Sequence, residues 1–164
     1  MLFRSLSRQS HTQGLGALSF QMHQHNPVCW VVGLMLRVFA RLYRYSGDIS
    51  WLNAADTLYQ WLLLAHDSKY TNITSAKLAW GAAEMASVTG DPRWYLMAKK
   101  ILNWLVSQQD TSGVWVRRPQ YEKVSAQPID VSLDTSLERL LYLIDIPRAL
   151  SLAQSHPSFQ GQAS

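Results

Sequence analysis

The chain has 164 residues, 48% of them hydrophobic, which is long and apolar enough for one domain with a buried core. Its formal net charge of +4 is unevenly placed, because the stretch from Met1 to Gly47 contains arginines but no acidic residue. These arginines form neither a continuous run nor a known binding module, which argues against nucleic acid as a partner. A single cysteine, Cys29, excludes an intrachain disulfide and makes a thiolate metal site improbable.

The most apolar stretch runs from Pro27 to Leu36 and contains Cys29. This setting favours an inert, buried thiol over a nucleophile. The stretch does not predict a membrane span, since Arg37 and Arg41 interrupt its continuation. The first ten residues are rich in Arg and Ser and lack the apolar core of a signal peptide. We therefore expect a cytoplasmic protein, with an organelle presequence as the alternative.

The composition divides the chain into three parts. Residues 1–26 are rich in Gly, Ser, Gln and His and predict a loop or a poorly ordered lead-in. Residues 27–155 carry helical periodicity and predict one helical-hairpin domain. Residues 156–164 are rich in Ser and Gln and predict a flexible tail.

The first predicted hairpin lies between Pro27 and His66. Its first helix runs from about Pro27 to Tyr45 and is apolar around most of its circumference, so we expect it to be largely buried. Gly47 suits the left-handed position that ends a helix, and Asp48 is a good N-cap for the next. The second helix then extends to about His66.

The second predicted hairpin has the same organisation. Its first helix, from about Thr74 to Val88, is rich in alanine, and small side chains permit close approach of a neighbouring helix. Gly90 and Asp91 repeat the device that ends one helix and caps the next. The fourth helix begins at Pro92, which suits a first turn.

The third predicted hairpin is short. A polar loop from Asp110 to about Pro128 leads into a fifth helix over residues 129–145. Pro147 then predicts a break and the start of a sixth helix over residues 148–154, because proline disrupts a helix interior. Three antiparallel hairpins in an all-α fold are expected.

The first two hairpins are copies of one another. A shift of 43 residues superimposes their turn glycines, capping aspartates, tryptophans and apolar stripe: Gly47 on Gly90, Asp48 on Asp91, Trp51 on Trp94, Ala55 on Ala98, Trp61 on Trp104 and Leu62 on Leu105. A period of about 40 to 47 residues is typical of stacked or closed helical arrays.

The segment from Lys100 to Trp115 resembles the QW motif of terpenoid cyclases and prenyltransferase-type α/α toroids. The motif's core, Gln-x-x-x-Gly-x-Trp, is present as Gln109, Gly113 and Trp115. Ile101 departs from the small residue usual at its position, and the first hairpin has no such loop. The resemblance implies an enzyme that cyclises an apolar polyene or polyprenyl substrate, started by an acid.

A second resemblance lies in the turn at residues 89–94, which is similar to turns of carbohydrate-active toroids. It implies the alternative of a sugar epimerase, a lyase or a glycosidase. A third alternative, favoured by the short length, is a non-catalytic binding or assembly module. Both resemblances imply a partial α/α toroid over residues 27–150, with the first, third and fifth helices on the inside.

A complete ring needs more hairpins than the three predicted. The chain is therefore expected to be a fragment, a half-ring completed by a homodimer, or an open curved array. The sequence contains no glycine-rich phosphate loop, nucleophile elbow or His-Glu-x-x-His segment, so no cofactor is predicted.

The candidate catalytic acids on the fifth helix are Asp130 and Asp134, which share a face because they are four residues apart. The segment from Ser132 to Thr135 resembles the Asp-x-Asp-Thr acid of class II terpenoid cyclases, with Ser132 in place of the first aspartate. Asp134 would then be the proton donor, which requires an apolar surround that keeps it protonated. The alternative is a first-turn acid at Asp130 and an ordinary polar position at Asp134.

Glu84 is a third candidate acid, because it falls within an otherwise apolar helix. It is either a buried acid in a cavity or the partner of an arginine such as Arg41, its equivalent in the first hairpin. Pairing is the favoured interpretation.

Four residues are candidates for binding a small apolar molecule or a sugar. Trp30, Tyr43 and Trp80 lie on the predicted inner helices, where they line a cavity or belong to the core. His25 precedes the first helix and could reach the same rim. It forms a His-x-His pair with His23, but no third ligand is evident, so no metal site is predicted.

Overall fold

A computed structural model of the chain describes residues 29–72, 74–116 and 124–160. Across these ranges the regular structure is helical, apart from an isolated antiparallel bridge between Gln109 and Trp115. The all-α prediction is therefore confirmed. The predicted lead-in and His25 lie outside the described residues.

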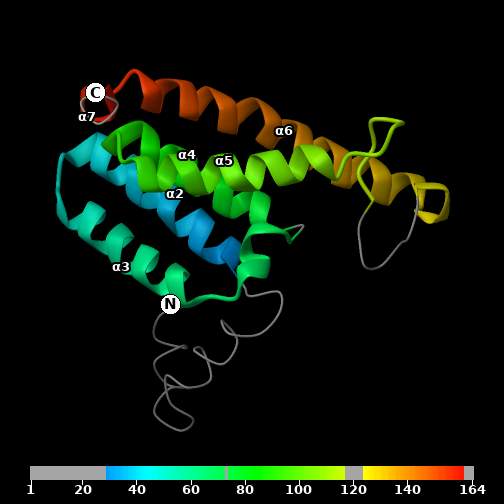
Figure 1. Cartoon of the computed structure of the whole chain (residues 1–164), viewed down its shortest axis with the longest axis horizontal. Helices are drawn as coiled ribbons and strands as arrows, with labels where there is room; N and C mark the ends of the chain where they lie inside the picture. The colour runs from blue at the N-terminus through cyan, green and yellow to red at the C-terminus, as the bar shows by residue number, and fades with distance from the viewer. Residues whose placement is uncertain (1–28, 73, 117–123, 161–164) are drawn as a thin grey trace, which may run out of the picture.

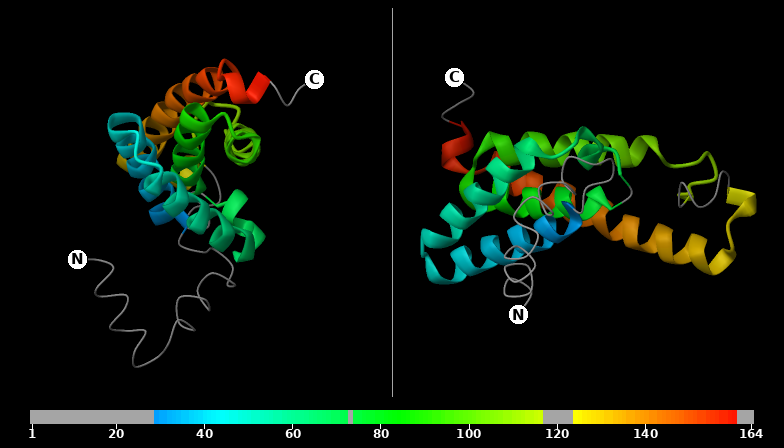
Figure 2. Two further views of the ribbon diagram at one scale, coloured as in Figure 1. Left: turned by 90° about the vertical axis from the view of Figure 1, so that its left-hand side faces the viewer. Right: turned by 90° about the horizontal axis from the view of Figure 1, so that it is seen from below.

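The first four predicted helices are present, with ends close to the expected ones. In chain order the elements are α2 (Cys29–Ser46), α3 (Ser50–Leu64), the 3-10 helix η1 (Asp67–Tyr70), α4 (Ser75–Thr89), α5 (Pro92–Ser107), the 3-10 helix η2 (Val124–Ala126), α6 (Ile129–Gln154) and α7 (Pro157–Gln160). α4 packs against both α2 and α6, while α3 packs on α2 and α5 packs on α4 (Figures 1 and 2). We call α2, α4 and α6, which run in the same direction, the central layer.

The turn between α2 and α3 is built on Gly47, whose φ of +69° is left-handed as predicted. Its N–H donates to the Tyr43 carbonyl at 2.8 Å, and the Ser46 hydroxyl accepts from the Asp48 N–H at 3.1 Å. The Asp48 carboxylate in turn accepts from the Ser50 N–H at 2.9 Å. This backbone hydrogen bond is the main reason that the pKa of Asp48 lies below its ordinary value.

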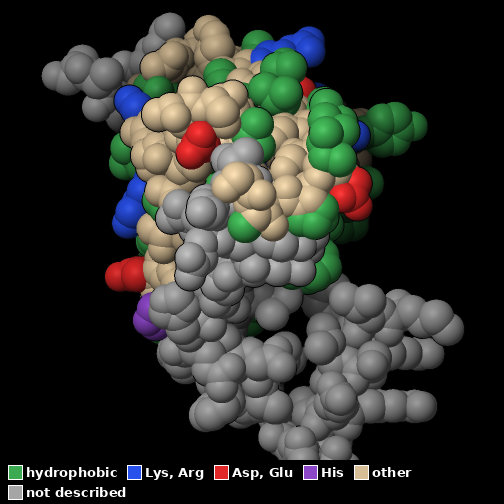
Figure 3. All heavy atoms as spheres, turned by 90° about the vertical axis from the view of Figure 1, so that its right-hand side faces the viewer, with side chains coloured by type: hydrophobic (Ala, Val, Ile, Leu, Met, Phe, Trp, Pro, Cys, Tyr) green, Lys and Arg blue, Asp and Glu red, His purple; other side chains and the backbone are tan. Residues whose placement is uncertain are grey.

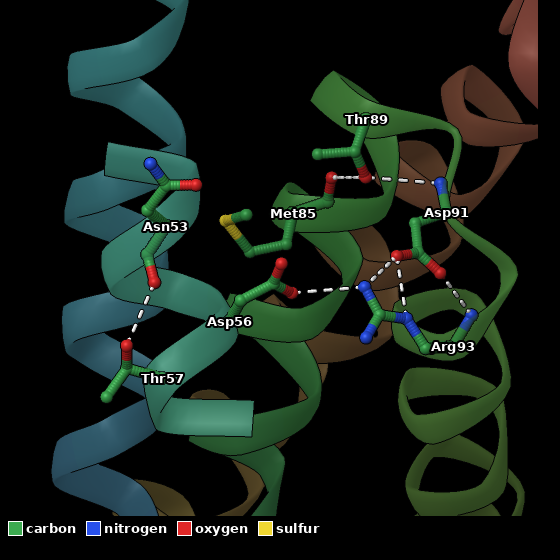
Figure 4. Close-up of polar contacts among 7 residues, drawn as sticks. All are labelled: Asn53, Asp56, Thr57, Met85, Thr89, Asp91 and Arg93. Atoms are coloured by element: carbon green, nitrogen blue, oxygen red, sulfur yellow. Dashed lines mark hydrogen bonds and ion pairs between the residues drawn. The ribbon is translucent and has the colours of Figure 1, made fainter. Parts of the chain in front are cut away.

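The turn between α4 and α5 repeats these hydrogen bonds one by one. Gly90 has φ +66°, and its N–H donates to the Ala86 carbonyl at 2.8 Å. The Thr89 hydroxyl accepts from the Asp91 N–H at 3.1 Å, and the Asp91 carboxylate accepts from the Arg93 N–H at 2.8 Å (Figure 4). The repeat predicted from the sequence is thus present in the backbone of both turns.

The two turns differ in what covers them. A Cβ on Gly47 would meet nothing within 4 Å, whereas one on Gly90 would lie 2.5 Å from Nδ1 of His156. Both Gly47→Ala and Gly90→Ala should lose about 1 kcal/mol from the positive φ. We expect Gly90→Ala to lose about 1–2 kcal/mol more, because His156 and the start of α7 must move.

Urea unfolding of the two alanine variants measures this difference directly. Gly47→Ala serves as the control, since it carries the backbone strain without the steric contact. Equal losses in the two variants would contradict the placement of His156 over the second turn.

Arg93 ties the second hairpin to the first. Its guanidinium forms ion pairs with Asp91 and, at 3.0 Å, with Asp56 on α3 (Figure 4). Trp94, one residue later, is buried and meets the Tyr59 ring of α3 edge-on at 4.9 Å. Its repeat equivalent, Trp51, is half-buried and stacks on Phe39 of α2 at 5.8 Å. The tryptophans therefore occupy equivalent positions, but only Trp94 contacts an earlier hairpin.

The loop after α5 has the geometry expected of a closed turn. Gly113 has φ +81°, and the Gln109 side chain donates to the Gly113 carbonyl at 2.9 Å. Trp115 is buried, and its indole N–H donates to the Leu105 carbonyl at 2.9 Å, which satisfies a carbonyl at the C-terminal end of α5. The Gln127 side chain donates to the Trp115 carbonyl at 3.1 Å and to a hydroxyl in the first turn of α6.

The predicted break at Pro147 is wrong, because α6 continues through it from Ile129 to Gln154. The chain therefore forms two hairpins and one long helix in its described part, in place of three hairpins. Ile146 and Leu150, on either side of the proline, are both buried. A proline inside a helix removes one backbone hydrogen bond and costs about 3 kcal/mol. The free energy gained by burying Ile146 and Leu150 offsets this cost.

Cys29 begins α2 and is 1% exposed. Burial raises the pKa of its thiol to about 11, against the opposing charge of Lys69. The buried thiol predicted from the sequence is therefore confirmed, and its raised pKa favours the unreactive form.

Candidate functional site

Seven charged and aromatic side chains meet across the central layer. They are Arg37 and Arg44 on α2, Lys77, Trp80 and Glu84 on α4, and Glu138 and Tyr142 on α6. We call this set the layer cluster. In the sequence its members lie up to about a hundred positions apart, and the parallel alignment of α2, α4 and α6 brings them together.

The centre of the cluster is a stack of three side chains, one from each helix. The Arg37 guanidinium lies 3.3 Å from the centroid of the Trp80 ring, and the Tyr142 ring meets Trp80 edge-on at 5.5 Å. Burial lowers the pKa of Arg37 from its ordinary value, and repulsion from Arg41 adds to this effect. The stack is a cation–π arrangement that fixes the spacing of the three helices.

Glu84 supplies the negative charge at one end of the cluster. Its carboxylate lies 3.8 Å from Nε of Arg37 and 3.5 Å from Nη2 of Arg44. Arg44 also donates to the Ser87 hydroxyl at 3.0 Å. The predicted pairing of Glu84 with an arginine is confirmed, but its partners are Arg37 and Arg44 and not Arg41. The two partners are seven residues apart and so lie on one stripe of α2.

The other end of the cluster joins α4 to α6. The Lys77 ammonium lies 2.9 Å from the Glu138 carboxylate, which also accepts a 3.0 Å hydrogen bond from the Tyr142 hydroxyl. Burial raises the pKa of Tyr142, and the Glu138 charge raises it further. Burial also acts to raise the pKa of Glu138, but hydrogen bonds from Lys77 and Tyr142 outweigh it and leave that pKa below 4.5.

Glu138 therefore makes stability depend on pH on the acid side. A carboxyl whose pKa is lower in the folded state contributes stability above its unfolded pKa and loses it as pH falls through the folded pKa. We expect Glu138→Gln to flatten the loss of stability between about pH 5 and about pH 3. Urea midpoints across this range measure the effect. Parallel curves for the variant and the wild type would contradict it, and Asp134→Asn, at an exposed carboxylate of the same helix, is the control.

The predicted binding residues are divided between different places. Trp80 is at the centre of the layer cluster, and Trp30 lies at its edge, 38% exposed, with the Lys77 ammonium 5.9 Å from its ring centroid. Tyr43 is four residues after Phe39, whose ring stacks on α3, so helical spacing places Tyr43 toward α3 and away from Trp80. The structure therefore groups Trp30, Trp80 and Glu84, and it leaves Tyr43 outside that group.

Asp130 and Asp134 are both exposed, near the start of α6. The pair Lys77–Glu138 sets the first turn of α4 beside the third turn of α6, so the two aspartates lie beyond the beginning of α4 (Figure 1). They are thus separated from Glu84 and Trp80 along the layer. Neither is in the apolar surround that a proton donor to an alkene requires.

Sequence reasoning missed Arg37, Arg44, Lys77, Glu138 and Tyr142. A usable signal existed for α2 and α4, because the repeat places Arg37 on Trp80 and Arg44 on Ser87, and each of these equivalent pairs is in contact. Equivalent positions of neighbouring repeats lie side by side in a stacked array. α6 is outside the 43-residue repeat, so its members had no such signal.

The outward side of α6 is a second feature of the central layer. Six large apolar residues, spaced to lie on one face of the helix, are exposed there: Ile129, Leu133, Leu137, Leu140, Leu141 and Ile144. The exposed fractions are 59% for Leu137, 62% for Leu141 and 65% for Ile144. We call this face the α6 edge. Figure 3, which looks onto the end where α6 begins, shows hydrophobic side chains at the surface there.

The opposite face of the same helix belongs to the core, through Tyr142, Ile146 and Leu150. Within the first four turns the buried residues of α6 are Thr135, Arg139 and Tyr142, so the large apolar side chains of this part of the helix lie mainly on its exposed face. By contrast, the outward side of α5 carries the charged residues Arg93, Lys99 and Lys100 around the exposed Leu96. The exposed apolar composition of the α6 edge therefore favours contact with another protein surface.

The fold and these surfaces define an all-α protein of packed helical hairpins. No family model, curated protein or solved structure matches the chain. Within the described ranges, no helix is long and apolar enough to cross a bilayer. Among the same residues, no three His, Cys, Asp or Glu side chains gather as a metal site would require.

Proposed function

We propose that this chain is a helical-hairpin assembly module, which binds a further helical unit through the α6 edge. The observation that carries the proposal is the exposure of six large apolar residues on one face of a helix whose other face is already in the core. An exposed apolar face of this kind is typical of protein interaction sites. The assignment as a segment of an α/α toroid is part of the same proposal.

The layer cluster supports a structural role over an acid-catalysed reaction. Glu84 is 15% exposed, and its carboxylate forms ion pairs with Arg37 and Arg44 that join α4 to α2. Trp80 is in contact with both Arg37 and Tyr142, so these surfaces are used in joining α2, α4 and α6. The cluster holds the layer in the geometry that presents the α6 edge.

The second candidate function is a cyclase-like toroid enzyme, and one observation favours it. The loop with Gln109, Gly113 and Trp115 closes through hydrogen bonds in which each motif residue takes part. Asp134 lies next to the exposed leucines of the α6 edge, and a partner that covers this edge would supply the apolar surround a proton donor needs. On this alternative a polyprenyl-type substrate is turned over only by the assembled protein.

Sedimentation velocity over about a hundredfold range of concentration tests the assembly module. We expect the wild-type chain to associate, and Leu137→Glu to weaken the association at least ~10-fold, because a carboxylate would be buried in the contact. Leu96→Glu is the matched control, since Leu96 is 63% exposed on the outward side of α5. A wild-type chain that remains monomeric throughout would overturn the proposal.

A further inference from the structure

The two outer helices of the central layer, α2 and α6, each have an exposed face. α4 lies in its middle, with α2 on one side and α6 on the other. The far side of α6 is the α6 edge. One stripe of α2 is also exposed and apolar, with Leu34, Val38 and Tyr45 spaced four and seven residues apart, and Trp30 begins this stripe beside Lys77 of α4.

This stripe, together with Arg41, is the α2 edge. Val38 is 52% exposed and Tyr45 is 92% exposed, and Arg41 is exposed between them. The sequence has no acidic residue before Asp48, so the α2 edge carries only positive charge. It is therefore an apolar surface with a basic residue within it.

The α6 edge carries the opposite charge. Asp130 and Asp134 are exposed beside its leucines. The one basic residue between Ile129 and Ile144 is Arg139, and it is buried. Two α6 edges placed face to face would bring like charges together, whereas an α6 edge against an α2 edge brings opposite charges together.

Resting on the proposed function, we infer that the helical unit bound by the α6 edge is the α2 edge of a second copy of this chain. In this contact the α6 edge of one copy lies against the α2 edge of the next, with Asp130 and Asp134 beside Arg41. The contact is head-to-tail, because the two surfaces differ, and such a contact closes into a ring or extends into a chain.

Two complementary variants test the contact. The first, Leu137→Glu with Leu141→Glu, disables the α6 edge and leaves the α2 edge intact. The second, Val38→Glu with Arg41→Glu, disables the α2 edge and leaves the α6 edge intact. Each full-length variant is examined alone and in an equimolar mixture by sedimentation velocity, with circular dichroism to verify the helical content.

We expect each variant alone to be monomeric and the mixture to form a one-to-one dimer, because one intact edge of each kind remains. Self-association of the second variant alone would show that α6 edges bind each other, which overturns the head-to-tail contact but leaves the assembly module standing. A mixture that stays monomeric while the wild type associates would also overturn the contact.

Single changes keep the test decisive if a double variant loses helical content. Leu137→Glu and Val38→Glu alter side chains that are more than half exposed, so their folding cost is small. The same pattern of monomers alone and a dimer in the mixture is expected. The control variant Leu96→Glu keeps both the α2 edge and the α6 edge, so it should self-associate as the wild type does.

Discussion

Gly81→Ala is expected to destabilise the protein by about 3 kcal/mol or more, although alanine is the better helix former by about 1 kcal/mol. A Cβ on Gly81, in the middle of α4, would lie 2.1 Å from the Gly33 carbonyl oxygen of α2. Because that neighbour is backbone, the contact cannot be relieved by turning a side chain. The two helices would have to separate.

The reciprocal change gives an internal check. A Cβ on Gly33 would lie 2.2 Å from the Lys77 carbonyl oxygen, so Gly33→Ala should cost a similar amount. The double variant should cost less than the sum of the two, since one separation of the helices relieves both contacts. Guanidinium unfolding measures all three free energies.

Asn103→Ala, on the exposed side of α5, is the control and should change stability by less than about 0.5 kcal/mol. A Gly81→Ala variant as stable as the wild type would show that α2 and α4 do not meet backbone to backbone. That result would also count against the layer cluster as described, because the cluster depends on the close approach of α2 and α4. Arg37 and Trp80 are brought into contact by the same pair of helices.

Trp115→Ala should lose about 4 kcal/mol, because it removes a large side chain that is 1% exposed. It also leaves the Leu105 carbonyl, at the end of α5, without its 2.9 Å hydrogen bond from the indole. The loss should extend to the beginning of α6, since Gln127 bonds both to the Trp115 carbonyl and to the first turn of that helix.

Trp115→Phe separates burial from the hydrogen bond. It keeps most of the apolar surface and removes the N–H donor, so we expect a smaller loss of about 1–2 kcal/mol. Hydrogen exchange should show faster opening at the end of α5 in both variants, with α2 and α3 as the internal reference. A Trp115→Ala loss below about 1 kcal/mol would contradict the role of this loop in closing α5.

Of the candidate site, the sequence led to Glu84 and Trp80 but not to their partners. Glu84 stood out because a carboxylate in an apolar helix needs a partner. The choice between Arg37, Arg41 and Arg44 depended on the rotation of α2 about its own axis, which helical spacing alone does not provide. Glu138 and Tyr142 were missed because α6 is outside the 43-residue repeat, so no equivalent position pointed to them.

What the sequence determined by itself was local. The helical periods and the glycine–aspartate turns depend on residues a few positions apart, and the 43-residue repeat follows from comparing two such local segments. The tertiary structure alone decided which faces of α2 and α6 remain exposed. A face is buried only when another helix, distant in the sequence, lies against it, and that depends on how the whole chain packs.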